Sequence, residues 1–416
     1  MKNIERVNFK LYPTEEQKEI MLLNCHNARF AYNWAVARIK ECYKTKDRIP
    51  TPYTLASEFA KFKKQPGYEW LVQKPASQRA TKLAITNSIS RSIVKFYLRQ
   101  NEFPTFHSKR NARMSYYSHE GTTLYENNRV RLENLGWVEC RNNLPLDDKN
   151  IKICDPCIIF TGDYFELSCS IKYKKPVKPK YHHSDVDIHH QPIGIDVGVT
   201  HMAVTSDGDF YDIPTEKLKK IDKRINRVNR RIDRIRNMNK NVTQTCDTKT
   251  KYPEYEVKSQ NLLKLESKRR KLYERHANIR KDIRCQAVAD IVKKYPSAIV
   301  IEGIKDPKES WKIKGAYKFN KRISDVAVGD FLNRLKCKCE WLDIPLIIAD
   351  KAYPSTKTCS CCGNVLDNQL TKDRMFICSV CGYEEDRDIN AAINLRNLAT
   401  NESNGDEYFE YNSIIA

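Results

Sequence analysis

Four cysteines near the C-terminal end of this 416-residue chain have the spacing of a zinc site. They form two Cys-x-x-Cys pairs separated by 15 residues, and a glycine follows the second cysteine of each pair. Each pair can bind one side of a tetrahedral zinc ion, and the glycine permits the tight turn of a knuckle. Cys361 lies inside the first pair and could compete as a ligand. We predict one structural zinc ion, with free thiols or an iron–sulfur site as alternatives, bound by Cys359, Cys362, Cys378 and Cys381.

Three carboxylates stand where an unpaired charge would be costly. Asp196 lies in the apolar run IGIDVGVT, Glu302 lies in the apolar run IVIEGI, and Asp388 directly precedes a helical run in EEDRDINAAINL. Such an acid usually faces a cation or the edge of a site. Three of them could meet at one edge of a sheet and hold two magnesium ions, and two-metal sites of this kind promote attack of water on a phosphodiester. By spacing alone, a nuclease and a purely structural role both remain open, since a strand aspartate near a glycine can simply make a turn.

The segments around these acids are predicted to be strands and helices. Residues 193–213 have the pattern of a β-hairpin, and the runs SAIVIEGI and IPLIIADKAYP have the composition of short strands. Residues 217–241 and a second segment that begins at residue 259 have helical spacing. One face of the first helix is apolar and its other faces are cationic, which favours phosphate binding over a solvated helix pair.

The N-terminal half is predicted to combine strands with helices. The run ERVNFKLYP alternates like an edge strand, and Thr14 and Gln17 then fit a capping box at the start of a long helix. A further helix is predicted over about residues 77–99, and residues 120–175 have the pattern of strands. A polar segment with histidines and prolines follows, and we place the main domain boundary there.

The net charge indicates a polyanionic partner. Lysine and arginine outnumber aspartate and glutamate by 73 to 52, a formal charge of +21 at pH 7. This favours nucleic acid over an acidic membrane surface or a generic basic protein. No run of about 18 apolar residues is present, so no membrane partner is expected. The 15 cysteines are an odd number and no signal-peptide core precedes them, so we expect a reducing compartment.

Several blocks of the sequence resemble the TnpB proteins, which are encoded by bacterial insertion sequences and are related to the compact type V CRISPR effectors. The blocks GIDVGVTHMAV, IVIEGI, YPSTKTCSCCG and CSVCGYEEDRDINAAINL resemble the C-terminal signature of the family in order and spacing. Upstream, FKLYPTEEQ, ARFAYNWAVA, FPTFHSKRNARMSY and ISDVAVGDFLNRLKCKCEW resemble further family blocks. The resemblance therefore spans nearly the whole chain.

The resemblance implies a fold with α/β, β-barrel and helical parts. The C-terminal half would be a RuvC-like nuclease domain of the RNase H type with a zinc-ribbon insertion. The N-terminal half would be a small, wedge-like β-barrel interrupted by a helical recognition domain. The predicted boundaries are 1–12 and 119–180 for the barrel, 13–118 for the recognition domain, 181–191 for a linker, 192–356 and 384–400 for the nuclease domain, 357–383 for the zinc-binding insertion and 401–416 for a flexible tail.

The resemblance also implies an RNA-guided DNA endonuclease associated with a transposable element. It would bind a guide RNA derived from the element's end, with one chain per guide RNA, and cut double-stranded DNA beside a short flanking motif by two-metal hydrolysis. The implied cofactors are two magnesium ions, one zinc ion and the guide RNA, and the implied location is the bacterial cytoplasm or nucleoid. The alternatives are a guide-dependent DNA-binding protein or repressor without cleavage, a small type V CRISPR effector, and an accessory protein of a transposase.

Carried over residue by residue, Asp196, Glu302 and Asp388 match the three catalytic acids of the family. Asp386 competes for the third place, and we favour Asp388 because related effectors keep the acid two residues before the helix asparagine, here Asn390. The four cysteines match the zinc ligands, and the knuckle would brace the element that bears the third acid. The chain departs from the family at Cys361 and after the strand glutamate, where Gly-Ile replaces the frequent Asp-Leu.

Five residues are predicted to contact nucleic acid. In residues 101–118 cations are interleaved with aromatic rings, which suits phosphates and stacked bases, although a basic loop over a core would show the same pattern. We assign Lys109, Arg110 and Arg113 to phosphates. Lys74 and Gln78 are candidates for touching the bases of the flanking motif.

Overall fold

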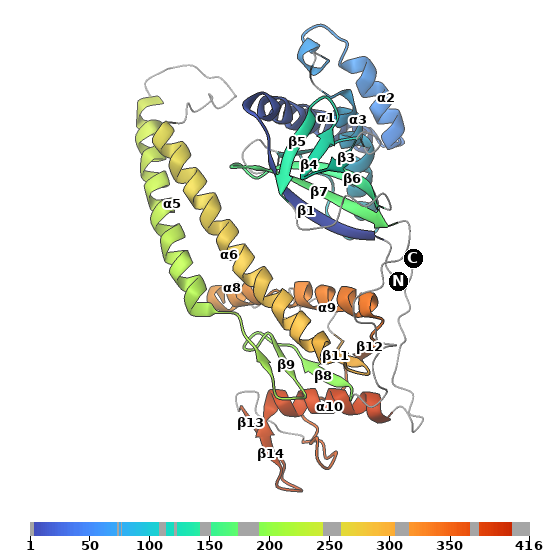
Figure 1. Cartoon of the computed structure of the whole chain (residues 1–416), viewed down its shortest axis with the longest axis vertical. Coiled ribbons are helices and arrows are strands. Elements are labelled where there is room, and N and C mark those ends of the chain that lie inside the picture. The colour runs from blue at the N-terminus through green and yellow to red at the C-terminus, as the bar shows by residue number, and fades with distance from the viewer. Residues whose placement is uncertain are drawn as a thin grey trace. The chain divides into compact units, whose positions relative to one another are not determined.

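The computed structural model describes residues 4–72, 75, 77–107, 114–119, 123–141, 151–173, 191–243, 259–303, 316–366 and 374–401. The chain divides into two compact units, residues 2–177 and 178–416, and each is described by itself (Figure 1). Most of the predicted linker and tail lies outside the described residues. Among the helices that are described, none combines the length and the apolar character needed to cross a membrane.

The first unit contains an antiparallel sheet of seven strands in the order β2-β6-β7-β1-β5-β4-β3. Within the described residues the edge strands β2 and β3 do not pair with each other, so the sheet is open and the predicted closed β-barrel is not confirmed. Closure depends on whether the two edges meet, and alternation along single strands carries no information about that. The strands are β1 (Ile4–Tyr12), β2 (Met114–Tyr117), β3 (Leu124–Glu126), β4 (Arg129–Leu132), β5 (Gly136–Arg141), β6 (Ile151–Phe160) and β7 (Phe165–Tyr173).

The helices of the first unit lie between β1 and β2 in chain order and share one hydrophobic core with the sheet. The predicted capping box is present, since the Thr14 hydroxyl accepts from the Gln17 N–H at 3.3 Å and Gln17 Oε1 accepts from the Thr14 N–H at 3.1 Å. The Gln17 amide also donates to two carbonyls of the β4–β5 region, so the cap fastens the helix to the sheet. The helices are α1 (Glu15–Thr45), α2 (Pro52–Phe62), the 3-10 turn η1 (Glu69–Leu71), α3 (Gln78–Leu83), the π-helical segment η2 (Ala84–Ile89) and α4 (Ser90–Tyr97).

The second unit is built on a mixed sheet of five strands in the order β10-β9-β8-β11-β12. The first three strands form an antiparallel meander, whereas β8, β11 and β12 run parallel to one another. The carboxyl ends of β8 and β11 therefore lie at the same edge of the sheet. The strands are β8 (Ile193–Asp196), β9 (Ala203–Thr205), β10 (Phe210–Tyr211), β11 (Ile299–Glu302) and β12 (Leu346–Ala349), and a separate hairpin consists of β13 (Met375–Ile377) and β14 (Glu384–Asp386).

Helices cover both faces of this sheet (Figure 1). Ile299 and Ile301 share a core with residues of α6 and α9, whereas Val300 faces the other way and packs with Leu395 of α10. The predicted basic helices α5 and α6 form a long antiparallel arm, and the predicted apolar face of α5 is buried in a core of its own. The helices of this unit are α5 (Thr215–Thr243), α6 (Gln260–Lys293), α8 (Tyr317–Val326), α9 (Val328–Leu342) and α10 (Arg387–Asn401).

Helix α10 lies directly on the backbone of β8. A Cβ atom placed on Gly194 would stand 1.9 Å from the Ala392 carbonyl oxygen and 2.4 Å from the Arg396 nitrogen. Only glycine leaves room for this approach. The contact fixes the distance between the strand that ends at Asp196 and the helix that begins beside Asp388.

We expect Gly194→Ala to destabilise the protein by about 3 kcal/mol, because the added methyl group must push backbone against backbone. Gly329→Ala is the matched control, since a Cβ there meets nothing within 4 Å. It should leave stability unchanged or raise it by up to about 1 kcal/mol. Urea unfolding of the full chain, followed by circular dichroism, measures both. Equal stability of the two variants would show that α10 does not rest on β8 in this way.

Candidate active site

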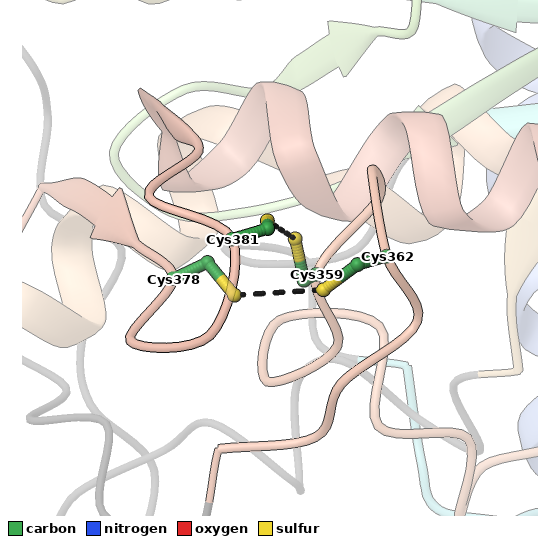
Figure 2. Close-up of side chains that lie close together, drawn as sticks. All are labelled: Cys359, Cys362, Cys378 and Cys381. Atoms are coloured by element: carbon green, nitrogen blue, oxygen red, sulfur yellow. Dashed lines mark hydrogen bonds between the residues drawn. The ribbon is translucent and has the colours of Figure 1, made fainter.

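The four predicted zinc ligands come together in the structure. Their sulfur atoms all lie within 4.8 Å of one another, and Figure 2 shows them facing each other from two loops. The Sγ–Sγ distances are 3.7 Å for Cys359–Cys381 and 3.6 Å for Cys362–Cys378. Ligands about 2.3 Å from a tetrahedral zinc ion would be separated by about 3.8 Å, so the donor set fits zinc. Cys361 is exposed and lies outside the cluster.

Backbone groups prepare each knuckle for a metal ion. Gly363 and Gly382 have φ angles of 75° and 71°, and their N–H groups donate to the carbonyls of Cys359 and Cys378. The sequence prediction that these glycines permit the turn is confirmed. The N–H groups of Cys381 and Val380 lower the pKa of the Cys378 thiol to about 6, so this sulfur favours the thiolate form that zinc requires.

Two buried asparagines of α10 fasten the first knuckle to the helix. The Ser360 N–H donates to Asn390 Oδ1 at 3.0 Å, and Asn390 Nδ2 donates to the Thr358 carbonyl at 2.8 Å. Asn394 Nδ2 donates to the same carbonyl at 2.6 Å and to the Ser355 carbonyl at 2.8 Å. The second knuckle is joined to α10 directly, because β14 ends at Asp386 and the helix begins at the next residue. These contacts are what the predicted bracing role of the knuckle requires.

The three predicted acids come together beside this ribbon. Asp196 and Glu302 are the last residues of the neighbouring parallel strands β8 and β11, whose register pairs Ile195 with Ile301. Asp388 is buried in the first turn of α10, which packs across β8 and β11. Residues almost 200 positions apart in the chain are thus placed at one edge of one sheet.

The charges of Asp388 and Glu302 act on the buried carboxylate of Asp196. Burial, together with the charges of Asp388 and Glu302, raises the pKa of Asp196 to about 7, whereas Arg387 opposes this shift. Burial also raises the pKa of Glu302. The acids are not as tightly packed as the cysteines, which are the only group in the described part of the chain with three or more ligand atoms mutually within 4.8 Å. Carboxylate oxygens are the ligands that a hard cation such as magnesium prefers, so neighbouring acids with unfavourable charge on Asp196 could hold one.

Asp386 and Asp388 have different partners. Asp386 Oδ1 accepts from the N–H groups of Asp388 at 2.8 Å and Ile389 at 3.3 Å, so it caps the start of α10. Asp388 is held by two arginines, with Arg374 at 2.9 Å on Oδ2 and Arg387 at 3.2 Å on Oδ1. The capping role of Asp386 escaped the sequence analysis, although an aspartate directly before a helical run is a known signal for it.

Most of the predicted nucleic-acid contacts cannot be placed. Lys74, Lys109, Arg110 and Arg113 lie outside the described residues. The side chain of Gln78 is engaged within the protein, since Oε1 accepts from Lys63 Nζ at 2.5 Å and Nε2 donates to the Leu71 carbonyl at 3.0 Å. The second N–H and the second lone pair of this amide are not used by these two hydrogen bonds, and the base contact stays a prediction.

Comparison with known families identifies three matching segments. Residues 1–48 match a helix-turn-helix domain of the IS605 OrfB group, residues 170–305 match the IS605 OrfB model described as "Probable transposase", and residues 329–395 match the Cas12f1-like TNB domain. The last segment includes all four cysteines, β12 and the part of α10 that bears Asp388.

Whole-chain relatives agree with these segments. The chain is 26% identical over 409 residues to a protein of Escherichia coli K12 provisionally named RNA-guided DNA endonuclease InsQ, covering 95% of this chain and 92% of the relative. It is 23% identical over 408 residues to a protein of Streptomyces pristinaespiralis that is provisionally named an RNA-guided DNA endonuclease, with 95% and 89% covered. Cas12f1, solved in a complex with sgRNA and target DNA, superposes with a TM-score of 0.51 at 13% identity over 95% of this chain and 99% of that one.

The fold is thus Cas12f-like, with mixed α/β sheets and a four-cysteine zinc-finger domain. The chain is similar to the IS605 OrfB proteins, also called TnpB, and to the related Cas12f proteins, through three matched segments and through relatives that span nearly its whole length. The resemblance found in the sequence is therefore confirmed.

We expect Cys378→Ser to lose bound zinc, because it removes one of the four converging sulfurs. Loss of the ribbon should also lower the melting temperature, since the Asn390 and Asn394 contacts to the first knuckle would no longer be held in place. Cys361→Ser is the matched control and should keep one zinc ion per chain. Zinc content by mass spectrometry of the purified proteins, with thermal melting, measures both effects. Retention of full zinc content by Cys378→Ser would contradict the four-cysteine site.

The raised pKa of Asp196 predicts a pH dependence of stability. Its folded-state pKa of about 7 lies above the ordinary value of 3.8, so the folded state binds this proton more tightly than the unfolded state. The contribution to the free energy of unfolding therefore falls as pH rises from about 4 to about 7 and stays low above that range. Asp196→Asn has no carboxyl group to ionise, so it removes the loss of stability that ionisation of buried Asp196 causes.

We expect Asp196→Asn, without added magnesium, to melt at a higher temperature than the wild type, with a clearly larger gain at pH 8 than at pH 5.5. Each kcal/mol corresponds to roughly 2–4 °C. Differential scanning fluorimetry at the two pH values gives the comparison. A gain of the same size at both would mean that charge at Asp196 does not limit stability.

Proposed function

We propose that the chain is an RNA-guided DNA endonuclease of an IS605-type transposable element that cuts double-stranded DNA beside a short flanking motif. The observation that supports this most strongly is the meeting of Asp196, Glu302 and Asp388 at one edge of one sheet, beside a four-cysteine ribbon. Relatives that cover nearly the whole chain are named as RNA-guided DNA endonucleases. Cleavage, guide RNA and target DNA are thus consistent with both the site and the family.

The topology of the second unit supports a RuvC-like domain of the RNase H type. An antiparallel meander of three strands is followed by two strands parallel to the first, and a helix from later in the chain packs on one face. Acids at the ends of the first and fourth strands and in that last helix are the arrangement expected of such a nuclease. The five-stranded sheet and α10 would form the nuclease domain, and the ribbon between β12 and α10 would be its insertion.

The three acids would hold two magnesium ions. When bound, these ions would supply Lewis-acid stabilisation and a water of lowered pKa for attack on the phosphodiester. The protein's own part is to hold the three carboxylates near one another and partly shielded from water. Asp386 caps α10 and so orients the turn that bears Asp388, and Gly194 sets the distance from that turn to β8. We assign Asp388, rather than Asp386, as the third acid because the Asp386 carboxylate is committed to the helix cap.

The charge distribution supports nucleic-acid partners. One side of α5 presents a row of exposed cations at helical spacing, beside the buried apolar face. Cations in such a row can follow a phosphate backbone. We propose a guide RNA from the element's end and double-stranded target DNA as the partners, one chain per guide RNA, in the bacterial cytoplasm or nucleoid. The row consists of Lys220, Arg224, Arg227, Arg231 and Arg234.

A guide-dependent binding protein that does not cut is the second candidate. It would need no acid cluster, yet all three acids are present and converge, so no observation on this chain favours it. A small type V CRISPR effector would share the site, and the neighbouring genes, a repeat array or a transposon end, would distinguish the two.

The test starts from protein expressed with its own genomic flank. The RNA that copurifies is sequenced, and the complex is incubated with magnesium and a plasmid library that has randomised sequence beside a guide-matched target. We expect a discrete RNA, guide-matched cuts and one enriched flanking motif. A discrete RNA with no cuts by the wild type would favour the binding-only protein instead.

Acid variants in the same assay test the assignment of the site. We expect Asp388→Asn to lower the cleavage rate by about a thousandfold or more, as loss of a metal ligand would. Asp386→Asn should keep most of the activity, since asparagine also caps helices well. The reverse order of the two variants would make Asp386 the third acid.

A further inference from the structure

Both carboxylate oxygens of Asp388 are occupied by arginines. Arg374 Nη1 contacts Oδ2 at 2.9 Å, and Arg387 contacts Oδ1 through Nη2 at 3.2 Å and Nε at 3.4 Å. Asp388 is 8% exposed, so little of it is left for other partners. Each oxygen keeps lone-pair capacity, but the two guanidinium groups lie against the carboxylate and repel a divalent cation. The ion pairs and a bound metal at Asp388 therefore compete.

The two arginines are not equally free to leave. Arg387 adjoins Asp388 in α10, and its side chain is 20% exposed. Arg374 comes from the start of the β13–β14 hairpin, and its side chain is 46% exposed. Its backbone carbonyl accepts from the Arg387 N–H at 2.8 Å, so the backbone of Arg374 stays beside α10 even when the side chain turns away. Release of Arg374 exposes Oδ2 of Asp388 and needs only a rotation of one long side chain toward solvent.

The charge balance of the cluster favours such an exchange. Without a metal ion, the charges of Asp388 and Glu302 act unfavourably on Asp196, and the ion pairs of Arg374 and Arg387 compensate the charge of Asp388. Once dications are bound, that compensation is redundant and the guanidinium becomes unfavourable. Arg374 lies four residues before the zinc ligand Cys378. The ribbon therefore positions the guanidinium group that competes with a divalent cation at Asp388.

We propose that Arg374 is a positioning residue of the nuclease site: it holds Oδ2 of Asp388 in the metal-free protein and is displaced when a divalent cation binds. This rests on the proposed function, because it takes the three acids to be the metal site. The zinc ribbon then sets how tightly the catalytic metal is bound. Arg374 keeps the acid oriented and its charge compensated until the cation arrives.

The direct test is metal binding by the full-length, zinc-loaded chain without nucleic acid. Manganese is the probe, and free Mn²⁺ is measured by electron paramagnetic resonance during titration. We expect Arg374→Ala and Arg374→Gln to bind Mn²⁺ more tightly than the wild type, by roughly fivefold or more. Arg374→Gln keeps a polar side chain of similar length, and so provides a second reading if the alanine variant folds poorly. Zinc content and melting temperature are measured on the same samples.

Lys357→Ala is the matched control, since Lys357 is an exposed cation of the same ribbon and forms no ion pair with an acid in the described part of the chain. It should leave the manganese affinity within about twofold of the wild type, because a screened surface charge acts weakly at a distance. Tightening of the same size in Lys357→Ala would show a general charge effect and overturn the proposal. Unchanged or weaker binding in both Arg374 variants would overturn it as well.

Asp196→Ala separates this inference from the proposed function. If the acids form the metal site, this variant loses the manganese binding seen in the wild type. If it binds manganese as the wild type does, the proposed site is wrong and the inference falls with it. If Asp196→Ala loses binding while neither Arg374 variant gains any, the site stands and only the role of Arg374 is rejected.

Discussion

Repulsion among three carboxylates is the constraint on which the second unit depends. The charges of Asp388 and Glu302 raise the pKa of buried Asp196, so the backbone must hold these acids near one another. Parallel register fixes the ends of β8 and β11, and the contact of Gly194 with α10 fixes the third acid against them. Arg374 and Arg387 then compensate charge where the acids are most crowded. Scaffold rigidity and local counter-charge together keep the cluster in place.

The ribbon is too small to hold itself together by a hydrophobic core. Its buried cluster consists of little more than Phe376 and two of the metal-ligating cysteines. A zinc ion on the four cysteines would therefore supply most of its order, as is usual for domains of this size. The ribbon also holds the start of α10 in place. Its backbone is hydrogen-bonded to Asn390 and Asn394 of that helix, and its second strand leads into the helix without a linker. A structural metal can in this way support an acid that it does not touch.

Local chemistry made much of this predictable. The cysteine pairs, the capping box at Thr14, the apolar face of α5 and the strand positions of Asp196 and Glu302 each follow from spacing within a few residues, and each is found. What the sequence could not supply depends on distant partners. Whether the edges of the first sheet meet, which oxygen Arg374 contacts and where the amides of Asn390 and Asn394 point are decided by packing between segments that local patterns do not relate. The resemblance to a family supplied the grouping of the acids that spacing alone left open.

The helical arm has a consequence for how such proteins can vary. α5 and α6 lie in the chain between the two strands that end in Asp196 and Glu302, yet they pack against each other through a core of their own. The position of the acids therefore does not depend on the length of α5 and α6. Adding or removing whole helical turns in both helices would change how far the cationic row extends along a bound strand and leave the acid cluster untouched. The length of the α5–α6 arm can therefore change, in evolution or by protein engineering, while the sheet that bears the acids stays the same.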